Sequence, residues 1–249
     1  MLIRLEMKLD TDGILSYQMA SRFHGFLMEQ ISPEYAKLMH QSQLHPYTQH
    51  LEKRKSSWYW IINCLSQESF QYILQDGLET LEEITLYNLE NPIKILQKGY
   101  EEYSLKKLAE LFYKGQCSRY LQIHFISPTA FKQNGRYLFF PDIRCIYQSL
   151  MNKYDAVVGD EGMKDEETLA YLCDNTQMVW YDLKSVSYHL EGVKIPSYIG
   201  KITLKIKGAQ TMVNFAHALF QFGEYSGVGI KTSLGMGAIK LEKREKDDR

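Results

Sequence analysis

A run of eleven residues near the end of the chain, 227–237, has the residue types that could bind phosphate. It combines four glycines with Lys231, Thr232 and Ser233. The glycines are Gly227, Gly229, Gly235 and Gly237. Because glycine has no Cβ, the backbone N–H groups of such a loop can approach a phosphate chain closely. The lysine and the two hydroxyl groups would add direct phosphate contacts.

The spacing of this run excludes the two common nucleotide-binding motifs. A P-loop has Lys and Ser or Thr directly after its last glycine, whereas Ile230 separates Gly229 from Lys231 here. A dinucleotide-binding fingerprint requires a third glycine where this chain has Thr232. The run therefore indicates a glycine-rich loop that closes the last strand of a fold.

Two of the seven histidines, His40 and His45, lie five residues apart, just after a helix-like stretch. Histidine can act as a general acid or a general base because its pKa lies near neutrality. A histidine at a helix end is also commonly structural, since its charge can interact with the helix dipole. These residues alone leave both interpretations open.

The composition predicts a globular protein. Of 249 residues, 45% are hydrophobic and 24% are charged, which is sufficient for a core. No apolar run approaches the ~18 residues that a membrane-spanning helix needs, so no membrane partner is expected. The four cysteines are far apart and form no CxxC pair, which predicts no metal site and a reducing, cytoplasmic location. We expect no cofactor.

The net charge of −1 conceals two regions of opposite sign. Residues 193–241 contain six lysines and a single acid, Glu224. Residues 155–175 contain seven acids and a single lysine, Lys164. A polyanion would be steered to the first region and away from the second, although either could be an ordinary solvated face.

Periodicity predicts two successive β-α-β-β-α-β patterns. The first has strands at 3–9, 58–62 and 84–87 and helices at 16–31, 69–78 and 104–113. The second has strands at 120–126, 178–190, 202–206 and 236–241 and helices at 143–154 and 209–222. This α+β order favours two tandem ferredoxin-like (RRM-like) domains, residues 1–115 and 116–249, the second with the glycine-rich loop.

Several segments resemble one protein family. Residues 222–239, around the glycine loop, resemble the C-terminal signature of CRISPR-associated endoribonucleases of the Cas6 family, which cut repeat RNA into guide RNAs. Residues 125–131 with Gly135 and Pro141 resemble the start of that family's second domain, and 198–208 the strand before its final helix. The stretch 36–40 resembles the segment that ends in its catalytic histidine. The resemblance extends from residue 1 to about residue 241.

The resemblance implies a metal-independent endoribonuclease. In this reaction the 2′-hydroxyl attacks the adjacent phosphorus and leaves a 2′,3′-cyclic phosphate. His40 matches the family's catalytic histidine, and His45 lies where relatives often have a lysine. Lys53 begins a basic run that could grip phosphates near the cut or form a solvated turn. Which group is the acid and which the base stays open.

One departure from the family concerns a tyrosine. Some relatives have a tyrosine where this chain has Met28, which puts a tyrosine-assisted mechanism in doubt, although Tyr17 or Tyr47 could substitute. His24 lies nearby, but its neighbours are typical of a core, so a packing role is favoured.

For RNA binding, the resemblance implies the glycine loop with Lys231, Thr232 and Ser233. Lys201, Lys205 and Lys207 alternate with apolar residues, so they share one sheet face that could hold an RNA stem or simply face solvent. The expected partner is CRISPR repeat RNA, with an effector complex as a further candidate and a monomer or homodimer as the assembly. The alternatives are a non-catalytic CRISPR RNA-binding protein and an effector-complex subunit of the same fold.

Overall fold

The computed structural model describes residues 1–10, 15–41, 44–87, 89–159 and 165–242, and the side chain of His40 lies outside this description. The chain forms two compact units. Unit 1 comprises Met1–Ser104 and Lys231–Met236, and unit 2 comprises Leu105–Ile230 and Gly237–Arg249. The short segment Lys231–Met236 therefore belongs to the first unit, although most of the second precedes it in the sequence.

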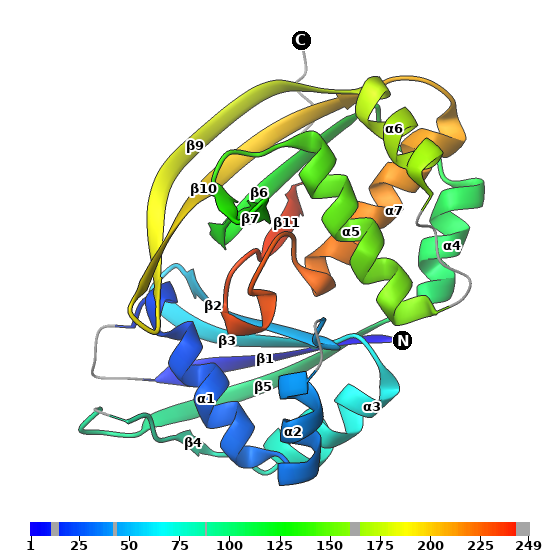
Figure 1. Ribbon diagram of the computed structural model, residues 1–249. Helices are drawn as coiled ribbons and strands as arrows, with labels where there is room; N and C mark the ends of the chain where they lie inside the picture. The colour runs from blue at the N-terminus through cyan, green and yellow to red at the C-terminus, as the bar shows by residue number, and fades with distance from the viewer. Residues whose placement is uncertain (11–14, 42–43, 88, 160–164, 243–249) are drawn as a thin grey trace. The chain divides into compact units, whose positions relative to one another are not determined.

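Unit 1 is an antiparallel sheet with helices against one face (Figure 1). Its strands are β1 (Leu2–Asp10), β2 (Tyr47–Arg54), β3 (Ser57–Cys64), β4 (Glu83–Ile84) and β5 (Ile93–Tyr103), in the spatial order β2-β3-β1-β5-β4. Its helices are η1 (Tyr17–Met19), α1 (Ala20–Gln30), α2 (Pro33–Gln41), α3 (Gln67–Ser69) and the π-helix η2 (Phe70–Leu78). Apart from the short β4, this strand order is that of a ferredoxin-like fold.

The alternation along β1 produces the core of unit 1. Leu5 and Met7 are fully buried, whereas Glu6 between them is only half-buried. From α1, Phe23 packs edge-on against Trp60 of β3, with ring centroids 5.0 Å apart. This contact places α1 over the β2–β3 side of the sheet.

Unit 2 repeats the pattern. Its strands are β6 (Tyr120–Thr129), β7 (Phe131–Gln133), β8 (Arg136–Leu138), β9 (Thr176–Leu190), β10 (Val193–Ile206) and β11 (Ile239–Glu242). Its helices are α4 (Leu105–Lys114), α5 (Ile143–Val158), α6 (Glu166–Asn175) and α7 (Gln210–Ser226). The main sheet has the order β11-β6-β10-β9, and β7 pairs with β8. The predicted class, two tandem ferredoxin-like domains, is confirmed.

Some elements differ from the sequence prediction. Strands β2 and β5 and helix α6 were not expected. The acidic stretch contains the start of α6, where the Asp165 carboxylate accepts hydrogen bonds from the N–H groups of Glu167 and Thr168. Acidic residues at a helix N-terminus satisfy its free donors, so part of this stretch has a structural role.

Helix α4 belongs to unit 2, whose first part begins at Leu105, whereas the sequence predicted a first domain of residues 1–115. Helix α4 packs against α7. The buried side chain of Asn214 on α7 donates to the carbonyls of Phe112 and Gly115 and accepts from the N–H of Cys117. These bonds attach the end of α4 to the second unit.

Among the described residues, no helix has both the length and the hydrophobicity to cross a membrane.

Candidate active site

Three rings from separate segments of unit 1 gather at the start of β2. They belong to His24 of α1, His45 in the segment before β2, and Tyr47, the first residue of β2. The Tyr47 hydroxyl lies 2.7 Å from Nδ1 of His24. The rings of His24 and His45 are nearly parallel, with centroids 6.4 Å apart, and His45 lies 5.8 Å from the Tyr47 ring. The cluster therefore brings two imidazoles and a phenol together.

Local structure explains this placement. Phe23 anchors α1 on Trp60, and the next residue of the helix, His24, is thereby held beside β2. Tyr47 is fully buried and pairs with Cys64 of β3. Burial raises the pKa of the Tyr47 phenol, so its hydroxyl stays protonated at all physiological pH values.

The structure places only some of the residues predicted for this site beside the three rings. His40 lies in the last turn of α2, four residues before the segment that carries Leu44 and His45, and its side chain is outside the described part of the chain. Met28, which stands in place of the family's tyrosine, packs against the hydrophobic core of unit 1. Tyr47, which could substitute for that tyrosine, forms a hydrogen bond with His24 through its hydroxyl group. The structure therefore brings His45 together with Tyr47 and with His24, which had been expected only to pack.

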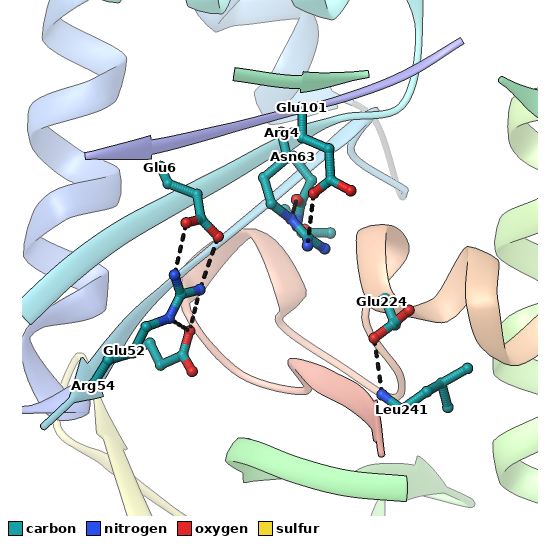
Figure 2. Close-up of polar contacts among 9 residues, drawn as sticks. Arg4, Glu6, Glu52, Arg54, Asn63, Glu101, Glu224 and Leu241 are labelled. Atoms are coloured by element: carbon teal, nitrogen blue, oxygen red, sulfur yellow. Dashed lines mark hydrogen bonds and ion pairs between the residues drawn. The ribbon is translucent and has the colours of Figure 1, made fainter. Parts of the chain in front are cut away.

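Lys53 lies away from the three rings. It is six residues beyond Tyr47 on β2, so their Cα atoms are about 20 Å apart at the rise of an extended strand. Its ammonium is 5.9 Å from the centroid of the Trp58 ring. The neighbouring Arg54 is already paired with the carboxylates of Glu6 and Glu52 (Figure 2). The basic run is therefore a less suitable phosphate grip than its sequence indicated.

The segment Lys231–Met236 is held against the same elements that carry the ring cluster. Its 3-10 helix η3 (Thr232–Leu234) packs on α1 and β2. The buried amide of Gln49 donates from Nε2 to the carbonyls of Ala20 and Ser233, at 2.8 and 3.0 Å. Its Oε1 accepts from the Trp60 indole at 3.0 Å. Lys231 is exposed at the start of this segment. Its positively charged side chain therefore belongs to a segment that packs on α1 and β2, the elements that carry His24 and Tyr47.

The glycines of the loop have a different role from the one predicted. Several N–H groups that could have faced a phosphate already donate within the protein. Gly227 donates to Gly223, Gly229 to the Ser149 hydroxyl, and Gly237 to Pro128. A Cβ at Gly229 would overlap the carbonyl oxygen of Ala130. Three of the four glycines are buried, and they permit close backbone packing.

The predicted lysine face lies on and just after β10. Lys201 forms an ion pair with Glu242 of β11, 2.7 Å between Nζ and Oε1, while Lys205 lies over the ring of Tyr120 on β6. Lys207 is exposed just beyond the strand. The shared face is present for Lys201 and Lys205, but Glu242 neutralises part of its charge. The single acid of the basic region, Glu224, accepts a hydrogen bond from the N–H of Leu241 (Figure 2).

Lys153 is a buried lysine that was not among the predicted site residues. From α5, its ammonium donates to the carbonyls of Ser226 and Gly227, at 3.1 and 3.0 Å, where α7 ends and the glycine loop begins. Burial lowers the pKa of Lys153 to about 7. Its spacing from Ile146 and Leu150, which are buried on the same stripe of α5, is the sequence signal that could have found it.

We expect Lys153 to make stability depend on pH. Its folded-state pKa lies below its unfolded value, so the unfolded chain binds more protons between pH 7 and about 10. The free energy of unfolding should therefore rise with pH in this window, by up to about 1.4 kcal/mol per pH unit. Urea denaturation at several pH values should show that Lys153→Met removes this slope. The exposed-lysine control Lys184→Met should keep it, and an unchanged slope in Lys153→Met would contradict the assignment.

Comparison with known proteins extends these observations. Residues 123–239 match the family described as CRISPR-associated endoribonuclease Cas6. A Cas6 endoribonuclease of Streptococcus thermophilus is 37% identical over 227 residues, which are 91% of this chain and 93% of the relative. One from Mycobacterium tuberculosis (strain CDC 1551 / Oshkosh) is 31% identical over 97% of this chain and 78% of its own. The solved structure of a Cas6 product complex covers 98% of this chain and 100% of its own, with a TM-score of 0.78 and 23% identity.

Identity at this level along nine-tenths of the chain establishes common descent with named ribonucleases. The chain, with its two ferredoxin-like units, is thus an endoribonuclease. The chain belongs to the CRISPR-associated endoribonuclease Cas6 family.

Proposed function

We propose that this endoribonuclease cleaves CRISPR repeat RNA in the precursor transcript and thereby produces guide RNAs. The observation that carries the proposal is the gathering of two imidazoles beside a cationic segment on α1 and β2. Imidazoles supply proton transfer near neutral pH, and Lys231 supplies positive charge for a phosphate. The family relationship gives the substrate class.

The proposed reaction needs no metal ion. A base removes the proton of the 2′-hydroxyl, O2′ bonds to the adjacent phosphorus, and the P–O5′ bond breaks to leave a 2′,3′-cyclic phosphate and a 5′-hydroxyl. His40 is the central catalytic residue of this proposal. Of the two assisting candidates, His45 is better supported than Lys53, because Lys53 lies about 20 Å along β2 from Tyr47.

We propose that RNA phosphates contact Lys231, Thr232 and Ser233 and the lysines at and beyond β10. Lys207 and Lys205 are better supported in this role than Lys201, which already pairs with Glu242. The contribution of the loop glycines is to position the backbone that carries Lys231, since their N–H groups at 227, 229 and 237 already have acceptors.

The test is cleavage of end-labelled repeat RNA from the host's own CRISPR array by purified protein in EDTA. We expect a single cut that survives EDTA and is abolished by a single 2′-deoxy substitution at the cut. His40→Ala should lower the single-turnover rate by roughly 10²–10⁴-fold, the usual contribution of a positioned acid or base. RNA binding by the variant should persist.

Other results would favour other assignments. Tight binding of repeat RNA without a cut would indicate a non-catalytic CRISPR RNA-binding protein or an effector-complex subunit. Cleavage that requires a metal ion would contradict the metal-free mechanism. Cleavage that tolerates the 2′-deoxy substitution would exclude attack by the 2′-hydroxyl.

A further inference from the structure

Strand β9 is the outer strand of the main sheet of unit 2. In the order β11-β6-β10-β9, β10 lies on one side of β9, and within the described part of the chain no strand pairs with its other side (Figure 1). Such an edge presents N–H and C=O groups that can pair with a further strand. Edge strands are often short, whereas β9 is 15 residues long. The edge is therefore suited to pairing with a strand of another molecule.

The middle of β9 exposes two large aromatic side chains. Trp180 is 48% exposed and Tyr181 is 62% exposed. Neighbouring residues of a strand point to opposite faces, so the two rings lie on opposite sides of the sheet. A strand added at this edge would cover part of both rings, and burial of their apolar area would favour the association.

Strand geometry limits the ways in which two copies of β9 can pair. In an antiparallel pair, a residue whose backbone groups point across the gap lies opposite another residue of the same kind. These residues alternate along β9 from 180 to 190, where it pairs regularly with β10. In a pair with two-fold symmetry, opposing residues must therefore both be even-numbered or both be odd-numbered. Each permitted register is thus centred on one residue.

One of these registers matches the charges of β9. With Leu183 at the centre, Asp182 of one copy lies directly opposite Lys184 of the other, and the symmetry repeats this pair. No other centre places these two residues opposite each other. Both side chains are exposed. Lys201, which lies opposite Asp182 on β10, is already paired with Glu242.

We propose that β9 is a self-association surface, at which two copies of this chain pair antiparallel with Leu183 on the two-fold axis. This register also sets Trp180 opposite Val186, and such aromatic and β-branched pairs stabilise antiparallel sheets. The joined sheet has the order β11-β6-β10-β9-β9-β10-β6-β11. Because the axis is perpendicular to it, the faces that carry Lys201 and Lys205 lie on the same side in both copies. The inference goes beyond the proposed function and does not depend on it.

Sedimentation velocity measures this association. We expect the wild type to shift from monomer toward dimer between about 1 and 300 µM. Asp182→Lys sets lysines opposite each other and Lys184→Asp sets aspartates opposite each other, so each variant should associate at least about tenfold more weakly. Glu102→Lys is the matched control, because it makes the same change of charge at an exposed residue of β5, and it should associate like the wild type.

A charge swap tests the register itself. The double variant Asp182→Lys/Lys184→Asp restores opposite charges across the axis and should dimerise like the wild type. A mixture of the two single variants should form a heterodimer, because the two lysines of Asp182→Lys meet the two aspartates of Lys184→Asp. Misfolding would not produce this pattern, since two misfolded variants do not recover when they are mixed.

Three results would overturn the inference. The first is a wild type that stays monomeric at about 300 µM. The second is dimerisation that the single variants leave unchanged, or that neither the double variant nor mixing restores, because the interface then lies elsewhere. The third is a monomeric wild type in which Trp180→Ser weakens binding of repeat RNA, since the strand then contacts RNA instead of a second copy. Failure to cut repeat RNA would reject the proposed function and leave the measured association as it is.

Discussion

Replacing Gln49 by leucine is expected to lower the free energy of unfolding by about 3 kcal/mol and to release the segment Lys231–Met236. The buried amide makes three hydrogen bonds, to Ala20, Ser233 and Trp60. Leucine has a similar volume but no polar atoms, so a buried indole N–H and buried carbonyls lose a partner, each at a cost of about 1 kcal/mol or more. The bond to Ser233 is a direct link between β2 and the segment that carries Lys231.

Two measurements separate the global effect of this substitution from the local one. Urea denaturation reports the free energy of unfolding, and hydrogen exchange reports opening of residues 231–236. Exchange in this segment should accelerate more in Gln49→Leu than in the rest of unit 1. Gln97→Leu, on the exposed face of β5, is the matched control and should change neither quantity appreciably. Exchange that stays as slow as in the wild type would mean that Gln49 does not anchor the segment.

The general architecture could be predicted because it follows from local patterns. The strict alternation of Leu5 and Met7 with charged residues marks β1, and helical spacing marks α1, α5 and α7. Strand β2 was missed because it buries Gln49 and His50, whose types favour solvent in a period-2 pattern. At Gln49, the burial is stabilised by partners on α1, β3 and η3, and no local pattern reveals these.

The boundary between the units shows the same limit. From the sequence, α4 was predicted to end the first domain, because it is amphipathic and is followed by Gly115. Its partner is the Asn214 side chain, about a hundred positions further along the chain. A polar residue within a helix gives no sign of a bond at that separation, so only the tertiary structure assigns α4 to unit 2.

The site was predictable in its parts but not in its arrangement. His45 and Lys231 were found from their segments, and both lie in unit 1. The pairing of His24 with Tyr47 joins residues 23 positions apart and depends on how Phe23 docks α1 on Trp60. His24 was therefore judged by its apolar neighbours, which describe only the side of the helix that faces the sheet.

The glycine loop shows how one residue type can satisfy two explanations. The glycines of the run 227–237 suggested a phosphate-binding loop, but the N–H groups of Gly227, Gly229 and Gly237 donate hydrogen bonds within the protein. Absence of a Cβ matters in both explanations. The distinction lies in what occupies the space, which is another backbone in this case, and this can be tested by substitution.

Replacing Gly229 by alanine is expected to destabilise unit 2 by about 3–5 kcal/mol, the range of the most severe single substitutions. Gly229 has a φ of 80°, where a Cβ is unfavourable, and that Cβ would also overlap the Ala130 carbonyl oxygen. Ala130 accepts a hydrogen bond from the N–H of Ile230, so moving its carbonyl weakens the bond that fixes the residue before Lys231. RNA affinity should fall together with stability.

Gly135 provides a matched control for this prediction. Its φ is 78°, almost the same as that of Gly229, but no atom lies within 4 Å of its built Cβ. Gly135→Ala therefore pays only for the left-handed backbone, about 1–2 kcal/mol. The difference between the two variants in urea denaturation isolates the cost of the close approach to Ala130. Equal destabilisation of the two variants would mean that the loop yields freely at Gly229, and that its glycines are required for conformation rather than for packing.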